Sequence, residues 1–129
     1  MMGYIEAGLA PLRNTGDIKL HGAEAFEGMR RAGQVTAEAL DMVTGLVQPG
    51  VTTAELDRAV LDFALAHDAL PATLYYRGYS HSSCISLNHV VCHGIPGSRA
   101  LRIGDILNID ITLIVDGWHG DSSRMYTVG

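Results

Sequence analysis

The sequence predicts an α+β fold in which two amphipathic helices pack on an antiparallel β-sheet with a C-terminal hairpin. In the first half, apolar residues recur at helical spacing, and after Pro71 the chain changes to short β-rich pieces separated by glycine and polar residues. No shift in composition divides the 129 residues, so we expect one compact domain.

The first half of the sequence supplies the two helices. Residues 1–22 mix glycine, proline, asparagine and aspartate without a sustained period, so we interpret them as an N-terminal extension to a domain over residues 23–129. The first helix should end at the sequence QPG, at 48–50. Its apolar positions are Phe26, Met29, Ala32, Leu40, Val43 and Val47. Thr52 and Glu55 match a capping box that begins a second helix, which ends near the sequence HDALP. Its apolar stripe comprises Leu56, Val60, Phe63 and Ala64.

The second half supplies the sheet. Three short strands are expected, namely ATLYYRGYS at 72–80, CISL at 84–87 and VVCH at 90–93. In ILNIDITLIV at 106–115 the odd-numbered residues form an apolar face, while the even-numbered face has a polar centre. Asp116 and Gly117 are typical of a two-residue hairpin turn, and WHGDSSRMYTV at 118–128 is the returning strand.

This hairpin predicts that two carboxylates converge. With Asp116 and Gly117 in the turn, Asp110 lies opposite Ser123 and Thr112 opposite Asp121, so the aspartates are diagonal neighbours roughly 7 Å apart on one face. Two ionised carboxylates so placed repel each other and lose hydration, and a divalent metal would offset both costs. The alternative is structural: Asp121 caps a turn, while Asp110 hydrogen-bonds Thr112 or Ser123.

Further candidate residues precede the hairpin or follow its turn. His93 comes just before the sequence GIPG and could reach into a cleft, although a loop histidine is also a common surface residue. His119 shares the acidic face nearer the turn, where we expect a supporting role. Tyr76, Tyr79 and Cys84 could line an apolar pocket, with core packing as the alternative.

Composition excludes several classes of protein. The net charge is −5 and the basic residues are scattered, so binding to nucleic acid is not expected. No apolar run approaches the roughly 20 residues that cross a membrane, and the first residues lack a secretory pattern, so we expect a cytoplasmic protein. Cys84 and Cys92 should then remain thiols.

Two long motifs resemble a known family. CISLNHVVCHGIPG at 84–97 and GDILNIDITLIVDGWHGDSSRMYTVG at 104–129 resemble the type I methionine aminopeptidases, which have the pita-bread fold. MRRAGQVTAEAL at 29–40 and VQPGVTTAELD at 47–57 are similar to the opening elements of that family. The resemblance covers about residue 20 to the end and implies half of a pita-bread fold.

The resemblance also implies roles for the candidate residues. Asp110 and Asp121 would be two of the five ligands of a centre with two divalent metal ions, of the cobalt, manganese, iron or zinc class. His93 would contact the substrate and assist proton transfer as the catalytic histidine. Tyr76, Tyr79 and Cys84 would bind the methionine side chain. The implied activity is hydrolytic removal of N-terminal methionine from peptides and nascent proteins.

The same resemblance implies that the site is incomplete. The family has a second half that supplies a histidine and two glutamates as the other three ligands, and this sequence shows no counterpart of them. Metal binding by the chain alone should therefore be weak, and we expect association with a complementary second half or with a second copy in a homodimer. The alternative is a non-catalytic or truncated half-domain.

Overall fold

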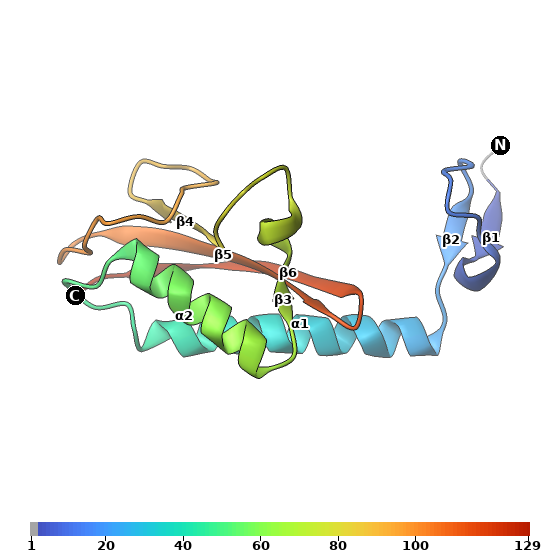
Figure 1. Ribbon diagram of the computed structural model, residues 1–129, viewed down its shortest axis with the longest axis horizontal. Helices are drawn as coiled ribbons and strands as arrows, with labels where there is room; N and C mark the ends of the chain where they lie inside the picture. Colours follow the sequence, from blue (N-terminus) through green and yellow to red (C-terminus); the bar gives the residue numbers. More distant parts are fainter. Residues whose placement is uncertain (1–2) are drawn as a thin grey trace.

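The fold is an antiparallel sheet with two helices on one side, as the sequence predicts. A computed structural model describes residues 3–129, and Figure 1 shows both helices below the sheet and irregular loops above it. The elements are α1 Ala23–Thr44, α2 Thr53–Ala66, β3 Leu70–Pro71, β4 Cys84–Leu87, β5 Ile106–Val115 and β6 Trp118–Thr127. The central strand is β5, which pairs with β6 along one edge and with β3 and β4 along the other.

The first helix begins as predicted but differs in its C-terminal end and in the burial of its first apolar residues. It ends at Thr44, before the QPG sequence, and Val47 is buried in the turn that follows. Phe26 and Met29 were expected in the apolar stripe, but they are 59% and 47% exposed. Figure 1 shows the reason: the first turns of α1 extend beyond the hairpin turn, where the sheet no longer covers them.

The second helix begins at the predicted capping box. The Thr52 hydroxyl accepts a hydrogen bond from the Glu55 N–H at 3.2 Å, and the Glu55 carboxylate accepts one from the Thr52 N–H at 2.7 Å. Leu56, Val60 and Ala64 are fully buried beneath the sheet. Both helices therefore bury apolar side chains against the same sheet.

Two of the three short strands expected before β5 were wrong. Residues 72–80 form a short 3₁₀ helix, Ala72–Tyr75, and then a turn in which Arg77 and Gly78 have positive φ angles. Residues 90–93 are irregular, and His93 also has a positive φ. These left-handed residues interrupt an extended chain. CISL is confirmed as β4, and the two-residue strand β3 was not predicted.

The sheet has a covered face and an open face. The odd-numbered side chains of β5 pack against the helices on the covered face and are at most 2% exposed; they are Leu107, Ile109, Ile111, Leu113 and Val115. On the open face, Asn108, Asp110 and Thr112 are only half-buried. The open face therefore leaves its polar side chains accessible between the loops.

The N-terminal residues lie beyond the far end of α1 (Figure 1). They contain a parallel pair of short strands, β1 Tyr4–Glu6 and β2 Ile18–Leu20. The ring of His21 packs edge-on against Trp118, with centroids 5.6 Å apart. A domain boundary at residue 22 stays a prediction. Among residues 3–129, no helix is long and apolar enough to cross a membrane.

Candidate metal centre

The hairpin of β5 and β6 has the predicted register. Asp110 lies opposite Ser123, and Thr112 lies opposite Asp121. The turn residues Asp116 and Gly117 have φ angles of 49° and 83°, as a type I′ turn requires. This tight turn fixes the pairing, so both aspartates lie on the open face.

The two carboxylates repel one another. Burial raises the pKa of Asp110, and the neighbouring Asp121 carboxylate raises it further. No lysine or arginine among residues 3–129 forms an ion pair with either aspartate. The pair is thus an unneutralised negative centre, which suits a cation.

The structural alternative is present only in part. The Thr112 hydroxyl donates a hydrogen bond to an Asp121 oxygen at 2.9 Å. Within the described part of the chain, neither Thr112 nor Ser123 hydrogen-bonds Asp110. Thr112 therefore orients Asp121, while the Asp110 carboxylate lacks the partners that a purely structural role would give it.

The donor set fits part of a divalent metal site. Carboxylate oxygens are suitable ligands for manganese, iron, cobalt and zinc, which take four to six ligands in all. Throughout residues 3–129, no group of three or more histidine, cysteine, aspartate or glutamate side chains is placed to hold a metal ion. Asp110 and Asp121 would therefore bind a metal only with further ligands from water or from other protein groups.

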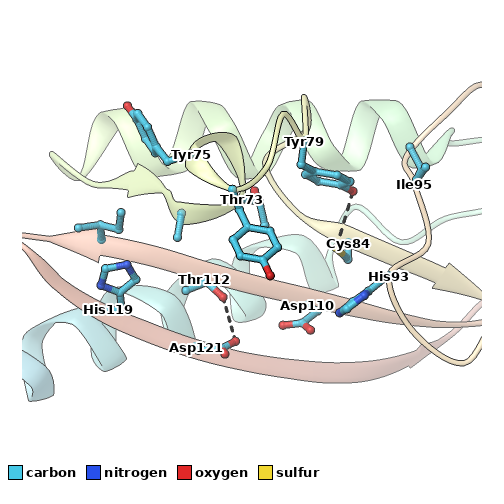
Figure 2. Close-up of a pocket in the computed structure, with 13 residues that line it drawn as sticks. Thr73, Tyr75, Tyr79, Cys84, His93, Ile95, Asp110, Thr112, His119 and Asp121 are labelled. Atoms are coloured by element: carbon cyan, nitrogen blue, oxygen red, sulfur yellow. Dashed lines mark hydrogen bonds between the residues drawn. The ribbon is translucent and has the colours of Figure 1, made fainter. Parts of the chain in front are cut away.

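A pocket of about 740 Å³ lies over the open face, and Figure 2 shows the side chains around it. The six residues to which the family resemblance gives a role all line this pocket: Tyr76, Tyr79, Cys84, His93, Asp110 and Asp121. The strands supply the aspartates and Cys84 from below, and the loops supply the other three. The structure thus gathers these residues around one cavity, whereas their chemical roles stay predictions.

The position of His93 depends on the backbone that follows it. The Gly94 N–H donates to the Ser86 hydroxyl at 3.0 Å, and the Ile85 N–H donates to the Gly94 carbonyl at 2.9 Å. A Cβ atom at Gly94 would lie only 2.1 Å from the Ile85 carbonyl oxygen. The loop is therefore pressed against β4, and His93 lies close enough to Asp110 to oppose the rise in its pKa (Figure 2).

Tyr79 and Cys84 form one wall of the pocket. The Tyr79 hydroxyl donates to the Ser83 carbonyl at 2.8 Å and lies 3.7 Å from the Cys84 sulfur (Figure 2). Burial raises the pKa of both side chains, so both are neutral at neutral pH. Tyr76 is 62% exposed at the mouth, where the Arg77 guanidinium lies 5.1 Å from the centre of its ring.

Several pocket residues were not selected from the sequence. They are Ala72, Thr73, Tyr75, Ile95, Thr112 and Ile114. Thr112 and Ile114 could have been found, because they share the open face with the aspartates. His119, which was expected on this face in a supporting role, also lines the pocket. Thr73 and Tyr75 could not be placed at the pocket from the sequence, because a strand was expected where the chain forms a 3₁₀ helix.

Comparison with known proteins agrees with this arrangement. The model of metallopeptidase family M24 matches residues 27–129. A methionine aminopeptidase of Rickettsia prowazekii (strain Madrid E) is 53% identical over 112 residues, which are 87% of this chain and 43% of that protein. The methionine aminopeptidase of Escherichia coli (strain K12) is 50% identical over 114 residues, with the same two coverages.

Solved structures have the same fold. The crystal structure of the R. prowazekii methionine aminopeptidase aligns with a TM-score of 0.84 and 52% identity, over 86% of this chain and 45% of that one. The methionine aminopeptidase of Thermotoga maritima gives 0.81 and 32%, over 84% and 44%. These alignments confirm half of a pita-bread fold.

The chain spans less than half of the length of these relatives. The family match nevertheless covers most of the chain, including both aspartates and His93. By sequence and by fold, the chain belongs to metallopeptidase family M24.

Proposed function

We propose that this chain forms part of a metal-dependent aminopeptidase that removes N-terminal methionine from peptides and nascent proteins in the cytoplasm. The observation that carries the proposal is the convergence of Asp110 and Asp121 beneath a pocket, in a chain of a metallopeptidase family. Relatives about half identical to this chain are named methionine aminopeptidases, which favours methionine as the residue removed.

In this proposal, Asp110 and Asp121 hold two divalent metal ions of the cobalt, manganese, iron or zinc class. When bound, such ions lower the pKa of a water molecule and polarise the carbonyl of the scissile peptide bond. Thr112 keeps one Asp121 oxygen in place through its hydrogen bond, leaving the other oxygen free as a ligand. The raised pKa of Asp110 reports a carboxylate whose charge a cation would stabilise.

The other pocket residues act on the peptide. The imidazole N–H of His93 donates to the carbonyl oxygen as negative charge develops there, or passes its proton to the departing amine nitrogen. Tyr79 and Cys84 form a neutral wall, and Tyr76 lies at the mouth. An unbranched thioether side chain suits such a wall, since sulfur packs favourably against aromatic rings.

Two aspartates leave most metal coordination positions to other groups. We therefore propose that the chain acts with a complementary second half, or with a second copy in a homodimer. The free edge of β6 supports this, because within residues 3–129 this ten-residue strand pairs with β5 alone. A complementary polypeptide could cover that edge and bring the missing ligands to the open face.

Peptide hydrolysis tests the proposal. The chain, alone and mixed with a second half taken from a full-length relative, is incubated with Met-Ala-Ser and cobalt or manganese. We expect Asp110→Asn to abolish the release of methionine, because it removes a metal ligand. Asp116→Asn is the matched control, since Asp116 lies in the same hairpin but outside the pocket. Equal turnover by the two variants would contradict the proposal.

A non-catalytic half-domain is the second candidate function. It is favoured by the lack of any three-ligand group among residues 3–129. Absence of turnover at every metal concentration, with and without the second half, would select it. Sedimentation analysis separates the assemblies, because a homodimer has twice the 13.8 kDa mass of the chain.

A further inference from the structure

A buried carboxylate outside the pocket supports the pocket wall. Asp57 lies on α2, is 8% exposed and does not line the cavity. Its oxygens accept hydrogen bonds from the Ser82 N–H, at 3.0 Å and 3.3 Å, and from the Ser83 hydroxyl, at 2.5 Å. Within residues 3–129 it forms no ion pair. The two serines therefore provide the stabilisation that a buried carboxylate needs.

The same two serines connect Asp57 to the wall. Ser82 and Ser83 are almost fully buried and immediately precede Cys84. The Ser83 carbonyl accepts the hydrogen bond from the Tyr79 hydroxyl, and that hydroxyl lies 3.7 Å from the Cys84 sulfur. Asp57 thus fixes the segment to which both wall residues are attached.

Two other links hold the wall: the Thr73 hydroxyl donates to the His81 carbonyl at 2.6 Å, and Cys84 begins β4, which pairs with β5. Tyr79 lies in the turn between the 3₁₀ helix and β4, outside any helix or strand. Its backbone N–H bonds only within the turn, to the Tyr76 carbonyl at 2.9 Å. On α2, in contrast, Leu56 and Val60 flank Asp57 and are fully buried in the core. A rigid helix therefore anchors an irregular turn through one carboxylate.

We propose that Asp57 is a positioning residue that holds Tyr79 and Cys84 in place and so sets the width of the pocket. For the substrate, the inference rests on the proposed function: this width would select the side chain of the first residue of the peptide. The geometric part concerns this chain alone and does not depend on catalysis.

The accessibility of Cys84 tests the geometric part. The rate of alkylation by iodoacetamide is measured at fixed pH in a Cys92→Ser background, so that Cys84 is the thiol observed. Ser83→Ala removes the hydroxyl hydrogen bond but keeps the Asp57 charge and the hydrogen bonds from the Ser82 N–H, and we expect it to raise the rate about twofold, because the wall loosens in part. Asp57→Ala removes all of these hydrogen bonds and should raise the rate about fivefold, and Asp57→Asn by less, since asparagine keeps an oxygen acceptor.

Asp62→Asn is the matched control on the same helix, because Asp62 is exposed and pairs only with Arg58. It should leave the alkylation rate unchanged. Circular dichroism and the thermal midpoint verify that each variant is folded. If an Asp57 variant is not folded, the alkylation rate of Ser83→Ala decides the test. Two outcomes overturn the proposal: folded Ser83→Ala that reacts like its parent, or Asp57→Ala and Asp57→Asn that accelerate equally.

Turnover tests the substrate part separately. In the active assembly, Asp57→Asn should raise KM for Met-Ala-Ser about three- to tenfold while kcat stays within about twofold, because binding is loosened but the metal ligands are untouched. An equal fall in kcat with unchanged KM would overturn this part. If no assembly is active, the proposed function fails, whereas the alkylation result still decides whether Asp57 holds the wall.

Discussion

The odd-numbered and even-numbered residues of β5 come from one ten-residue strand but meet different surroundings. Ile109 and Ile111 are fully buried against the helices, whereas Asp110, between them, faces the pocket and repels Asp121. The covered face contributes apolar burial, and the open face contributes charge that the fold does not neutralise. Stability and chemistry are thus assigned to alternate residues of one strand, so each can be changed separately.

The largest expected effect is on the covered face. Ile111→Ala should lower the free energy of unfolding by about 2–5 kcal/mol, because it leaves a cavity beneath the sheet. Ile114→Ala is the matched change on the open face, where the side chain is only half-buried, and should cost about 1 kcal/mol or less. Urea unfolding measures both. Equal losses would show that the two faces do not divide these roles.

The next effect concerns the close contact between α1 and β6. A Cβ atom at Gly120 would lie 2.3 Å from the Ala32 carbonyl oxygen, so Gly120→Ala should cost about 1–3 kcal/mol by forcing the helix away. Gly33 follows Ala32 on α1, and a Cβ atom there would meet no atom within 4 Å. Gly33→Ala should therefore stabilise the fold by about 0.5–1 kcal/mol. Thermal denaturation distinguishes these opposite signs.

A smaller effect, and one that depends on pH, is expected in the loop that carries His93. The Arg99 guanidinium, the Asn88 amide and the Arg102 N–H hold the pKa of Asp105 well below its usual range. Because the pKa of Asp105 is lower in the folded state, the ionised carboxylate stabilises the fold at pH values above the unfolded-state pKa of about 3.9. This stabilisation is lost as the pH falls toward the folded-state pKa.

Asp105→Asn should therefore destabilise the chain more at pH 7 than at pH 3. Urea unfolding at both values measures the difference, and the exposed Asp62→Asn should show little change at either. A loss from Asp105→Asn that is the same at both pH values would contradict the assignment.

The smallest effect on stability is expected at the candidate metal centre. Asp110→Asn should change the free energy of unfolding by no more than about 1 kcal/mol, toward greater stability at neutral pH, because it removes a repelled carboxylate. The same change should weaken manganese binding about tenfold or more. Calorimetric titration checks this, with Asp116→Asn as the control. A strongly destabilised Asp110→Asn would mean that the open face also supports the fold.

The parts of the fold that the sequence predicted are those set by local chemistry. The Asp116-Gly117 turn fixes the hairpin register, and Thr52 with Glu55 fixes the start of α2. These features arise within a few residues, so pattern and turn type are sufficient. The acidic pair followed from the hairpin in the same way, since two aspartates on one face need only the register. The roles expected of the other site residues came from the family resemblance: His93, Tyr76, Tyr79 and Cys84.

What could not be predicted depends on contacts between distant residues. The composition of VVCH is typical of a strand, but His93 has a left-handed backbone where Gly94 packs against Ile85 in β4. This contact between separate segments has no signal in the local sequence. The link from Asp57 to Ser82 spans 25 residues and leaves no periodic signal. Expectations of this kind fail because tertiary packing overrides local preference.

The type I′ turn also determines when the carboxylate pair forms during folding. A two-residue loop has a small closure entropy, and hairpins form in about 1–10 μs. Asp110 and Asp121 therefore meet as soon as β5 and β6 pair, before more distant segments have packed. Any ligand supplied by another polypeptide must arrive by slower association. In the assembly proposed above, the acidic pair would therefore form first, and the remaining ligands would be added in a second, slower stage.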